Sequence, residues 1–303
     1  MMFLVICIFL IVWYLTFRLC PLKIEHPTRQ MIPYESLQAG IPRRIWTFWN
    51  SEKIPEIVSA CIGTWKKHCP EYEITILTPR TLCNTLPNAQ KILKLPFANT
   101  PQRQADFIRL HVLYQHGGYW LDASIIMFQT LDVFGQHQQR DKSEFVGFYL
   151  NGFTTDPYTP VIENWFFGCV KGSAFVGMWR DEFMRINDYS SAMAYVDHAR
   201  LNNIRINGIP YLLSHYLSMH VAAQVVIQHH TYPIMERSSL QTAESGPFQY
   251  LQTNKWISKE AISWLVSRKQ DGSNMPPFIK LRGSERMLLQ NDPAALEILT
   301  RTV

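Results

Sequence analysis

The chain has 303 residues, of which 47% are hydrophobic and 17% are charged, and its formal net charge is +5. This composition can bury a large core, and it excludes a mostly disordered chain and a collagen-like repeat. The small positive excess is spread along the sequence, whereas nucleic-acid-binding proteins concentrate basic residues on one surface. The six cysteines show neither zinc-type nor disulfide-scaffold spacing. The length fits one domain of enzyme size or two small ones.

The first segment of the sequence predicts a membrane anchor. Residues 1–17 contain no charged side chain, and a helix of about 17 residues reaches about 25 Å, the short end of what spans a bilayer core. We therefore expect an uncleaved transmembrane helix over residues 1–18. A signal peptide or a buried terminal helix is the alternative, but the sequence lacks the basic start and small-residue cleavage site of a signal peptide. Positive residues from Arg18 to Arg44 follow the segment, which predicts a single-pass protein with a cytoplasmic main body.

The sequence after this segment predicts a stem and a folded body. Residues 19–40 contain three prolines among polar positions and are expected to form the stem, and residues 41–303 form the catalytic body. β-Forming side chains dominate Arg44–Asn50, which predicts a buried strand. A helix is expected over Pro55–His68 and a second strand over Tyr72–Leu77. The order strand, helix, strand predicts an α/β domain with a parallel sheet.

An acidic residue follows the next predicted helix. The apolar spacing predicts a helix over Gln102–His116 that ends at Gly117-Gly118. The run Tyr119–Met127 is typical of a strand, and Asp122 stands in its middle. An acid in so apolar a strand must be hydrogen-bonded, paired or bound to a metal ion. The alternative is a structural Asp that caps a turn at the strand end.

Three ordered motifs carry a family resemblance. The segments Ile41–Trp49, Ala105–Arg109 and Gly117–Ser124 resemble the sugar-nucleotide glycosyltransferases that share the DXD region, and within them the capsular polysaccharide synthesis family. Val161–Gly172 and Pro277–Gly283 resemble the same group more loosely. The resemblance implies a GT-A type fold, a Rossmann-like domain that binds a nucleotide sugar beyond the carboxyl ends of its strands.

Carried over position by position, the resemblance implies a donor site. It implies that Trp49 stacks on the nucleotide base and that Asp106 and Arg109 contact the sugar portion of the donor. It also implies that Lys280 neutralises charge on the leaving diphosphate. The residues alone leave plainer alternatives open: Trp49 as a core aromatic, Asp106 with Arg109 as a surface ion pair, and Lys280 as a solvated strand end.

The resemblance further implies that Asp122 helps to hold Mn²⁺ or Mg²⁺ against the diphosphate. The usual second acid is Ser124 in this sequence, which puts metal dependence in question, and Asp132 is a candidate for the missing charge. Glu163 and Asn164 stand beside another apolar strand, where the resemblance implies that they orient the acceptor or the donor. A strand-edge turn is the alternative for these two residues.

The other segments of the body predict further strands and helices. Thr81–Leu95 is expected to form short helical pieces, Glu144–Leu150 a strand, and Phe175–Ile186 a helix. Another helix is expected over Ile209–His220. His220 shows no metal-binding spacing, so it is predicted to be packed or exposed rather than catalytic.

These features together predict a membrane-anchored hexosyltransferase that serves polysaccharide biosynthesis. We expect transfer of a hexose from a nucleotide sugar, first of all a UDP-sugar, to a glycan or glycolipid, with retention of anomeric configuration as the resemblance suggests. The expected partners are the donor, the acceptor and the membrane, and not nucleic acid. The alternative is a catalytically degenerate relative that binds a sugar nucleotide or a glycan and scaffolds a membrane assembly. Ser124 keeps that alternative open.

Overall fold

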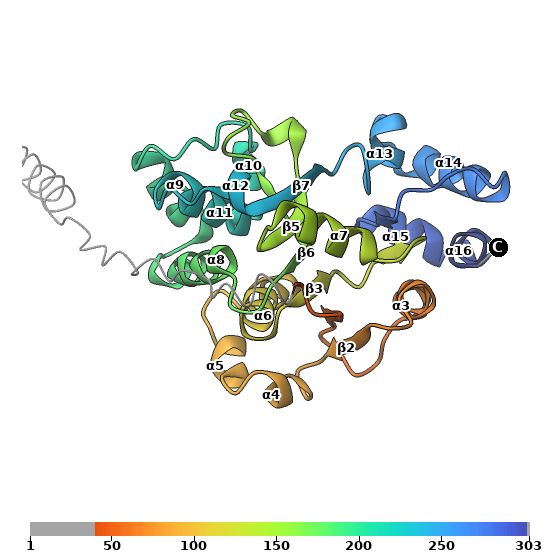
Figure 1. Cartoon of the computed structure of the whole chain (residues 1–303), viewed down its shortest axis with the longest axis horizontal. Coiled ribbons are helices and arrows are strands. Elements are labelled where there is room, and N and C mark those ends of the chain that lie inside the picture. The colour runs from red at the N-terminus through yellow and green to blue at the C-terminus, as the bar shows by residue number, and fades with distance from the viewer. Residues whose placement is uncertain (1–39, 302–303) are drawn as a thin grey trace, which may run out of the picture. The chain divides into compact units, whose positions relative to one another are not determined.

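A six-stranded sheet lies at the centre of the chain (Figure 1). The computed structural model describes residues 40–301. The strands of the sheet are Arg44–Phe48 (β1), Glu73–Leu77 (β2), Gly118–Leu121 (β3), Phe145–Tyr149 (β5), Ile162–Cys169 (β6) and Ser238–Thr242 (β7). Their order is β2-β1-β3-β6-β5-β7. The pairs β1–β2, β1–β3 and β5–β7 are parallel, and β6 runs antiparallel to β3 and β5. The predicted α/β class with parallel strand pairs is confirmed, and the sheet is mixed.

The first strand–helix–strand unit forms as predicted. Helix α3 (Glu56–His68) follows Pro55, which suits a helix start, and it carries basic residues in its last turn. Its apolar side chains, among them Trp65, are buried in the core on one face of the sheet. The chain then returns as β2, which pairs in parallel with β1 in the register Arg44 to Glu73.

A glycine turn sets β3 against β1. Helix α6 (Pro101–His116) is capped at its start by Thr100, whose hydroxyl accepts a hydrogen bond from the Arg103 N–H. Gly117 caps its end. Gly117 and Gly118 have φ values of 67° and 100°, which favour glycine. A Cβ atom on Gly118 would lie 2.7 Å from the Arg44 carbonyl oxygen. The turn therefore needs glycine for β3 to lie this close to β1.

Side chains of β3 alternate between two core clusters, one on each face of the sheet. Tyr119 and Leu121 pack in one cluster, and Trp120 packs in the other together with residues of α6. This alternation places Trp120 on the face that α6 covers.

The predicted strand over Tyr119–Met127 is wrong in one respect, because it is broken at Asp122. β3 ends at Leu121, residues 122–124 form a turn, and β4 (Ile125–Met127) pairs antiparallel with β8 (Phe278–Lys280) in a separate two-stranded sheet. The backbone N–H of Asp122 donates to the Trp165 carbonyl at 2.9 Å. β4 is buried throughout. Its residues are therefore as apolar as those of β3, and the sequence reads as one continuous strand although it is broken at Asp122.

Helices cover both faces of the sheet (Figure 1). Helix α11 packs on α8 and α9 on one face, and α3 packs on α15 and α16, which also contact α14, on the other. The helices not yet given bounds are α4 (Leu82–Thr85), α5 (Ala89–Leu93), α7 (Asp132–Asp141), α8 (Ala174–Met184), α9 (Ala192–Leu201), α10 (Tyr211–Ser214), α11 (Ser218–Gln228), α12 (Ile234–Arg237), α13 (Gln249–Thr253), α14 (Ser258–Gln270), α15 (Gly283–Gln290) and α16 (Pro293–Thr300), with 3₁₀ turns at Asn151–Phe153 and Arg185–Asp188.

Most of the other predicted elements are confirmed, and one helix is not. The short helices over 81–95, the strand at β5 and the helix at α8 form where they were expected. The predicted helix over Ile209–His220 is wrong, because α10 ends at Ser214 and α11 begins at Ser218. Tyr211, Leu212 and Leu213 in α10 are exposed, so an apolar sequence pattern there did not reflect a packed face.

The predicted anchor over residues 1–18 and nearly all of the predicted stem over residues 19–40 lie outside the described residues. Within residues 40–301, no helix combines the length and the apolar character needed to cross a membrane.

Candidate active site

Four elements bring the predicted site residues together at the carboxyl end of β3. Helix α6 supplies an acid and a base on one face, the turn after β3 supplies a second acid, and β6 and β8 supply an amide and an ammonium group. These residues are Asp106, Arg109, Asp122, Asn164 and Lys280. Five of the positions to which the resemblance assigned roles therefore lie in one connected network.

Arg109 is the centre of this network. Its Nη2 lies 3.2 Å from Asp106 Oδ1 and 3.4 Å from Asp122 Oδ1, and its Nη1 donates to the Asn164 carbonyl. The guanidinium lies over the Trp120 ring, 5.1 Å from the ring centroid. Arg109 is 4% exposed and Asp106 is 6% exposed. The alternative of a surface ion pair is therefore excluded.

Lys280 contacts the same carboxylate from the opposite side. Its Nζ lies 2.9 Å from Asp122 Oδ2 and 2.8 Å from Ser124 Oγ. Ser124 Oγ in turn donates to the Leu281 carbonyl at 3.0 Å, and Trp120 Nε1 donates to Asp122 Oδ1 at 3.0 Å. Lys280 is thus held in the site, and the alternative of a solvated strand end is excluded.

The two acids of the site ionise differently. Burial opposes ionisation of Asp122, but Lys280 and Arg109 outweigh it, so the pKa of Asp122 lies below its ordinary value. Burial raises the pKa of Asp106 above its ordinary value, although Arg109 and Arg103 act in the opposite direction. Neighbouring carboxyl groups with pKa values shifted in opposite directions are typical of functional sites.

The residues around Asp122 do not fit a divalent cation in this arrangement. The Lys280 ammonium lies between the two motif side chains, Asp122 and Ser124, and Arg109 faces the other Asp122 oxygen. A metal ion there would meet two fixed positive charges and one carboxylate, whereas Mg²⁺ prefers oxygen ligands with negative charge. No cluster of three or more His, Cys, Asp or Glu suited to a metal occurs within residues 40–301.

Asp132, the candidate for the missing charge, lies in a different contact. Its Oδ1 accepts a hydrogen bond from the Tyr72 hydroxyl at 2.8 Å and lies 3.4 Å from Arg43 Nη2. It begins helix α7. Asp132 is therefore engaged by Tyr72 and Arg43, in a contact separate from Asp122.

Glu163 and Asn164 lie within β6, so a strand-edge turn is excluded. Asn164 Nδ2 donates to Asp106 Oδ1 at 3.2 Å. Glu163 Oε2 lies 3.1 Å from His220 Nε2, and both side chains are buried. The prediction that His220 is packed is confirmed, but its carboxylate partner was missed. The two residues are 57 positions apart, and no local spacing signals that contact.

Trp49 immediately follows β1 and is half-buried. β1 and β3 are parallel neighbours with Trp46 opposite Trp120, so Trp49 stands level with the turn after β3. Trp46 is a buried core residue whose Nε1 donates to the Gly117 carbonyl at 2.9 Å. Stacking of a base on Trp49 stays a prediction.

A protein-family model matches the part of the chain that contains most of these residues. The model of the capsular polysaccharide synthesis protein family matches residues 22–207, more than half of the chain. The chain belongs to this family. The matched region contains Asp106, Arg109, Asp122 and Asn164, and Lys280 lies beyond it.

Two curated proteins are similar to this family member. Glycosyltransferase afumC of Aspergillus fumigatus (strain CBS 144.89 / FGSC A1163 / CEA10) is 22% identical over 275 residues, which cover 84% of this chain and 61% of that protein. O-glycosyltransferase PaGT of Phomopsis amygdali is 24% identical over 184 residues, which cover 54% of this chain and 43% of that protein. The chain therefore matches less than two thirds of the length of either relative.

Solved glycosyltransferase structures are more distant. The PaToxG glycosyltransferase is 13% identical with a TM-score of 0.38, and the match covers 88% of each chain. A glycosyltransferase involved in glycosylation of the major capsid of PBCV-1 is 10% identical with a TM-score of 0.38, and the match covers 82% of this chain and 98% of that one. Neither likeness is close enough to assign a role to a residue.

Proposed function

We propose that this protein is a GT-A type glycosyltransferase that moves a hexose from a nucleotide sugar, first of all a UDP-sugar, to a glycan or glycolipid. The observation that carries the proposal is the meeting of Arg109 and Lys280 on Asp122 at the carboxyl end of β3. Open α/β sheets bind ligands at that end of their strands. Two fixed cations there suit a diphosphate, and an adjacent acid and amide suit sugar hydroxyl groups.

The proposed transfer breaks the bond between the anomeric carbon of the donor sugar and a diphosphate oxygen. The bonding electron pair leaves with the diphosphate, the acceptor hydroxyl oxygen forms the new bond, and its proton passes to the departing diphosphate. Lys280 and Arg109 stabilise the charge that develops on the leaving group. Attack on the face that the diphosphate leaves gives the retention of configuration that the family resemblance implies.

The remaining residues orient the reactants in this proposal. Asp122 positions both cations because it contacts each of them. Asp106 and Asn164, which are hydrogen-bonded to each other, bind hydroxyl groups of the donor sugar. Glu163 lies beside them in β6 and orients the acceptor, and Trp49 stacks on the base. Positioning of this kind removes much of the entropic cost of a two-substrate reaction.

We further propose that Lys280 supplies the positive charge that the resemblance assigned to Mn²⁺ or Mg²⁺. The ammonium already contacts both motif side chains. Treatment with EDTA is therefore expected to leave donor hydrolysis by the purified protein within about twofold of the untreated rate. A rise of about tenfold or more on adding Mn²⁺ after EDTA would contradict this part of the proposal and restore the metal.

Assay of a panel of nucleotide sugars tests the central proposal. We expect the protein to hydrolyse or transfer from at least one donor. Asp122→Asn is expected to lower that rate about 100-fold, because Arg109 and Lys280 lose the charge that positions them. Glu297→Asn, which changes an exposed acid on α16, is the control. Absence of transfer and hydrolysis with every donor, together with unchanged nucleotide affinity in Asp122→Asn, would overturn the proposal.

A second candidate function rests on Ser124, which stands where the resembling enzymes have their second acid. It is a non-catalytic protein that binds a sugar nucleotide or a glycan and scaffolds a membrane assembly. Tight nucleotide-sugar binding without turnover, in the presence of glycan and glycolipid acceptors, would favour this function over transfer.

We also propose that residues 1–18 anchor the protein in a membrane as a single pass, that residues 19–40 are a stem and that residues 41–303 are a cytoplasmic catalytic domain. The support is the uncharged segment and the positive residues that follow it. External protease is expected to digest the body in sealed vesicles whose cytoplasmic side faces out. Protection of the body in those vesicles would reverse the proposed orientation.

A further inference from the structure

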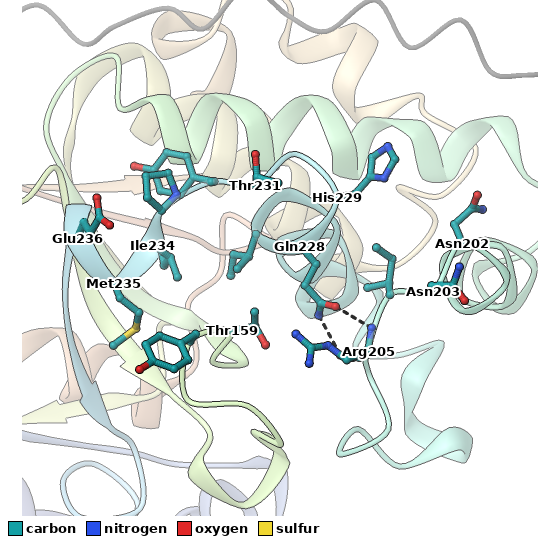
Figure 2. Close-up of a pocket in the computed structure, with 15 residues that line it drawn as sticks. Thr159, Asn202, Asn203, Arg205, Gln228, His229, Thr231, Ile234, Met235 and Glu236 are labelled. Atoms are coloured by element: carbon teal, nitrogen blue, oxygen red, sulfur yellow. Dashed lines mark hydrogen bonds between the residues drawn. The ribbon is translucent and has the colours of Figure 1, made fainter.

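A pocket of about 560 Å³ lies among the loops at the ends of α9 and α11 (Figure 2). It is formed by the residues after α9, the last residues of α11, the segment through α12, and the loop before β6. Its volume is within the range of about 300 to 1,000 Å³ that small-molecule sites have. None of the proposed donor-site residues lines it.

The lining of this pocket combines apolar and polar side chains. Its buried apolar side chains include Ile204, Ile227 and Ile234. The lining also contains five neutral, non-aromatic side chains that carry amide or hydroxyl groups: Thr159, Asn202, Asn203, Gln228 and Thr231. Amides and hydroxyls both donate and accept hydrogen bonds. The pocket therefore suits a ligand with apolar faces and hydroxyl edges, which is the character of a sugar ring.

An aromatic side chain at the rim adds to this fit. Tyr158 lines the pocket and is 78% exposed, so its ring offers a flat apolar surface with a polar tip. Tyr232, also in the lining, has a buried hydroxyl with no hydrogen-bond partner among the residues that the structure describes. Such unmet groups are uncommon in folded proteins and call for an explanation.

The charges of the lining do not favour an anion. Arg205 is the one Lys or Arg side chain of the lining, and its Nη2 is 2.7 Å from Asp156 Oδ2. Glu236 adds a negative charge to the same lining. A phosphate or nucleotide would need an excess of positive charge, so the lining favours a neutral ligand.

Hydrogen bonds connect the pocket to the elements of the donor site. Gln228 holds both the N–H and the carbonyl of Arg205, at 2.8 and 3.0 Å (Figure 2). Gln228 also donates to Gln224 at 2.7 Å, and Gln224 donates to the Pro160 carbonyl just before β6 at 2.7 Å. Helix α11 carries His220 near its start and Gln228 at its end, which places the two residues about 12 Å apart along the helix axis.

We propose that this pocket binds a neutral oligosaccharide, namely sugar units of the acceptor glycan that lie away from the reacting end. The binding chemistry follows from the lining, and the assignment of the ligand to the acceptor rests on the proposed function. The exposed side chain of Asn203 and the ring of Tyr158 recognise the glycan, Gln228 holds the backbone of Arg205 in place beside them, and Lys280 and Arg109 hold the donor elsewhere.

Calorimetric titration of the full chain tests the proposal. The probes are neutral pentasaccharides of glucose, mannose, galactose and N-acetylglucosamine, with inorganic phosphate as the anionic probe. We expect at least one pentasaccharide to bind, and Tyr158→Ala with Thr159→Val to weaken that binding about tenfold or more. Met287→Ala removes another exposed hydrophobic side chain, from α15, and is expected to leave oligosaccharide binding unchanged. Because Tyr158 is exposed, we expect the double variant to fold as the wild type does, and a thermal melt of each variant checks it.

Three results would overturn the proposal: no pentasaccharide binds, binding is unchanged in the Tyr158 and Thr159 double variant, or phosphate binds the pocket in place of the pentasaccharides. Donor hydrolysis measured on the same samples separates this proposal from the proposed function. We expect Asp122→Asn to lose hydrolysis and to keep oligosaccharide binding. Oligosaccharide binding that depends on Tyr158, in a protein that neither hydrolyses nor transfers from any donor and whose nucleotide affinity is unchanged in Asp122→Asn, would support the pocket and overturn the proposed transferase function.

Discussion

Lys280 and Arg109 restrain one carboxylate from two sides, and the ionised state of Asp122 depends on both. Neither cation comes from the strand that Asp122 follows: Arg109 belongs to α6 and Lys280 to β8. Lys280 is also fixed by its backbone, because its carbonyl accepts a hydrogen bond from the Tyr250 hydroxyl at 2.8 Å. The ammonium is therefore held in place before a ligand binds, which lowers the ordering cost of binding.

Replacement of Lys280 by Met tests its proposed role at the diphosphate. A hydrogen bond to a charged group contributes about 1.5 to 3 kcal/mol, so we expect Lys280→Met to weaken UDP binding about 10- to 100-fold. The affinity of the variant is also expected to depend less on salt concentration, because one charge is lost. Calorimetric titration with UDP at two salt concentrations measures both effects. Lys259→Met, in an exposed position of α14, is the matched control, and equal affinities in the two variants would contradict the role.

The sequence singled out residues that the structure brings together, but it did not predict their contacts. Asp106, Arg109 and Asp122 stand in motifs, and the resemblance placed them at one donor site. The direct contact of Lys280 with Asp122 spans 158 residues, and no periodicity or spacing relates positions so far apart. The partner of Glu163 was missed for the same reason, since His220 is on a helix whose start was itself predicted wrongly.

At the scale of the elements, the turn between α6 and β3 fixes where Asp122 lies. Gly118 must approach the Arg44 carbonyl of the neighbouring strand, and a side chain there would push β3 away from β1. The sequence predicted that the two glycines end a helix. It could not predict that the backbone at Gly118 lies close to that at Arg44, because that contact depends on how the strands pair.

Gly118→Ala is expected to destabilise the fold by about 2 to 4 kcal/mol, because a Cβ atom would clash with backbone and the φ of 100° is unfavourable for alanine. Gly63→Ala is the matched control. Gly63 lies in α3 with no atom within 4 Å of the added Cβ, so we expect that variant to gain up to about 1 kcal/mol. Urea unfolding measures both. Equal stability of the two variants would contradict the steric account of the turn.

Glu144, which directly precedes β5, is a buried acid whose carboxylate lies at the start of α8. Its carboxylate accepts hydrogen bonds from the N–H groups of Ala174 at 3.0 Å and Phe175 at 3.2 Å. Burial nevertheless raises the pKa of Glu144 to about 7, although those N–H groups and Arg237 act to lower it. The folded state therefore binds this proton more tightly than the unfolded state, in which the pKa is that of a solvated Glu.

Because the folded pKa is raised, the stability that protonated Glu144 contributes is full below the unfolded pKa and is lost as pH rises through about 7. Between pH 5.5 and 8.5 the loss is about 2 kcal/mol. Glu144→Gln is expected to remove this part of the pH dependence, and any constant cost of the substitution cancels in the difference between the two pH values. Urea unfolding of the wild type, Glu144→Gln and the exposed control Glu297→Gln at both values measures it. The same pH dependence in all three proteins would contradict the expectation.

At the scale of the whole molecule, the central sheet buries side chains on both faces. The order of strand, helix and strand at the start of the body predicted the α/β class, because alternating periods of apolar residues are local signals. The antiparallel placement of β6 beside β3 and the separate β4–β8 sheet were not predicted. Strand order is decided by contacts across the sheet, and the apolar run Tyr119–Met127 gave no sign that its two halves join different sheets.

The proposed anchor also belongs to this scale. Deletion of residues 1–18 is expected to release the protein from carbonate-washed membranes into the supernatant, since those residues carry the uncharged segment. We expect the deleted protein to bind UDP as the full chain does, because the proposed donor site lies within the described residues. Fractionation and titration of both proteins measure these effects. A deleted protein that stays in the washed membranes would show that another part of the chain attaches it.

The contact between Lys280 and Asp122 has a consequence for synthesis of the protein. A ribosome adds about 5 to 20 residues per second, so the 158 residues between the two side chains take about 8 to 30 s to make. Throughout that interval the nascent chain has Asp122 and Arg109 without the ammonium that completes the charge balance. A chain released after residue 207, where the family match ends, would contain the motifs by which the family is recognised. It would still lack Lys280, one of the two cations that contact Asp122. The proposed diphosphate site is therefore completed only in the late part of translation, after β1 and β3 have already emerged.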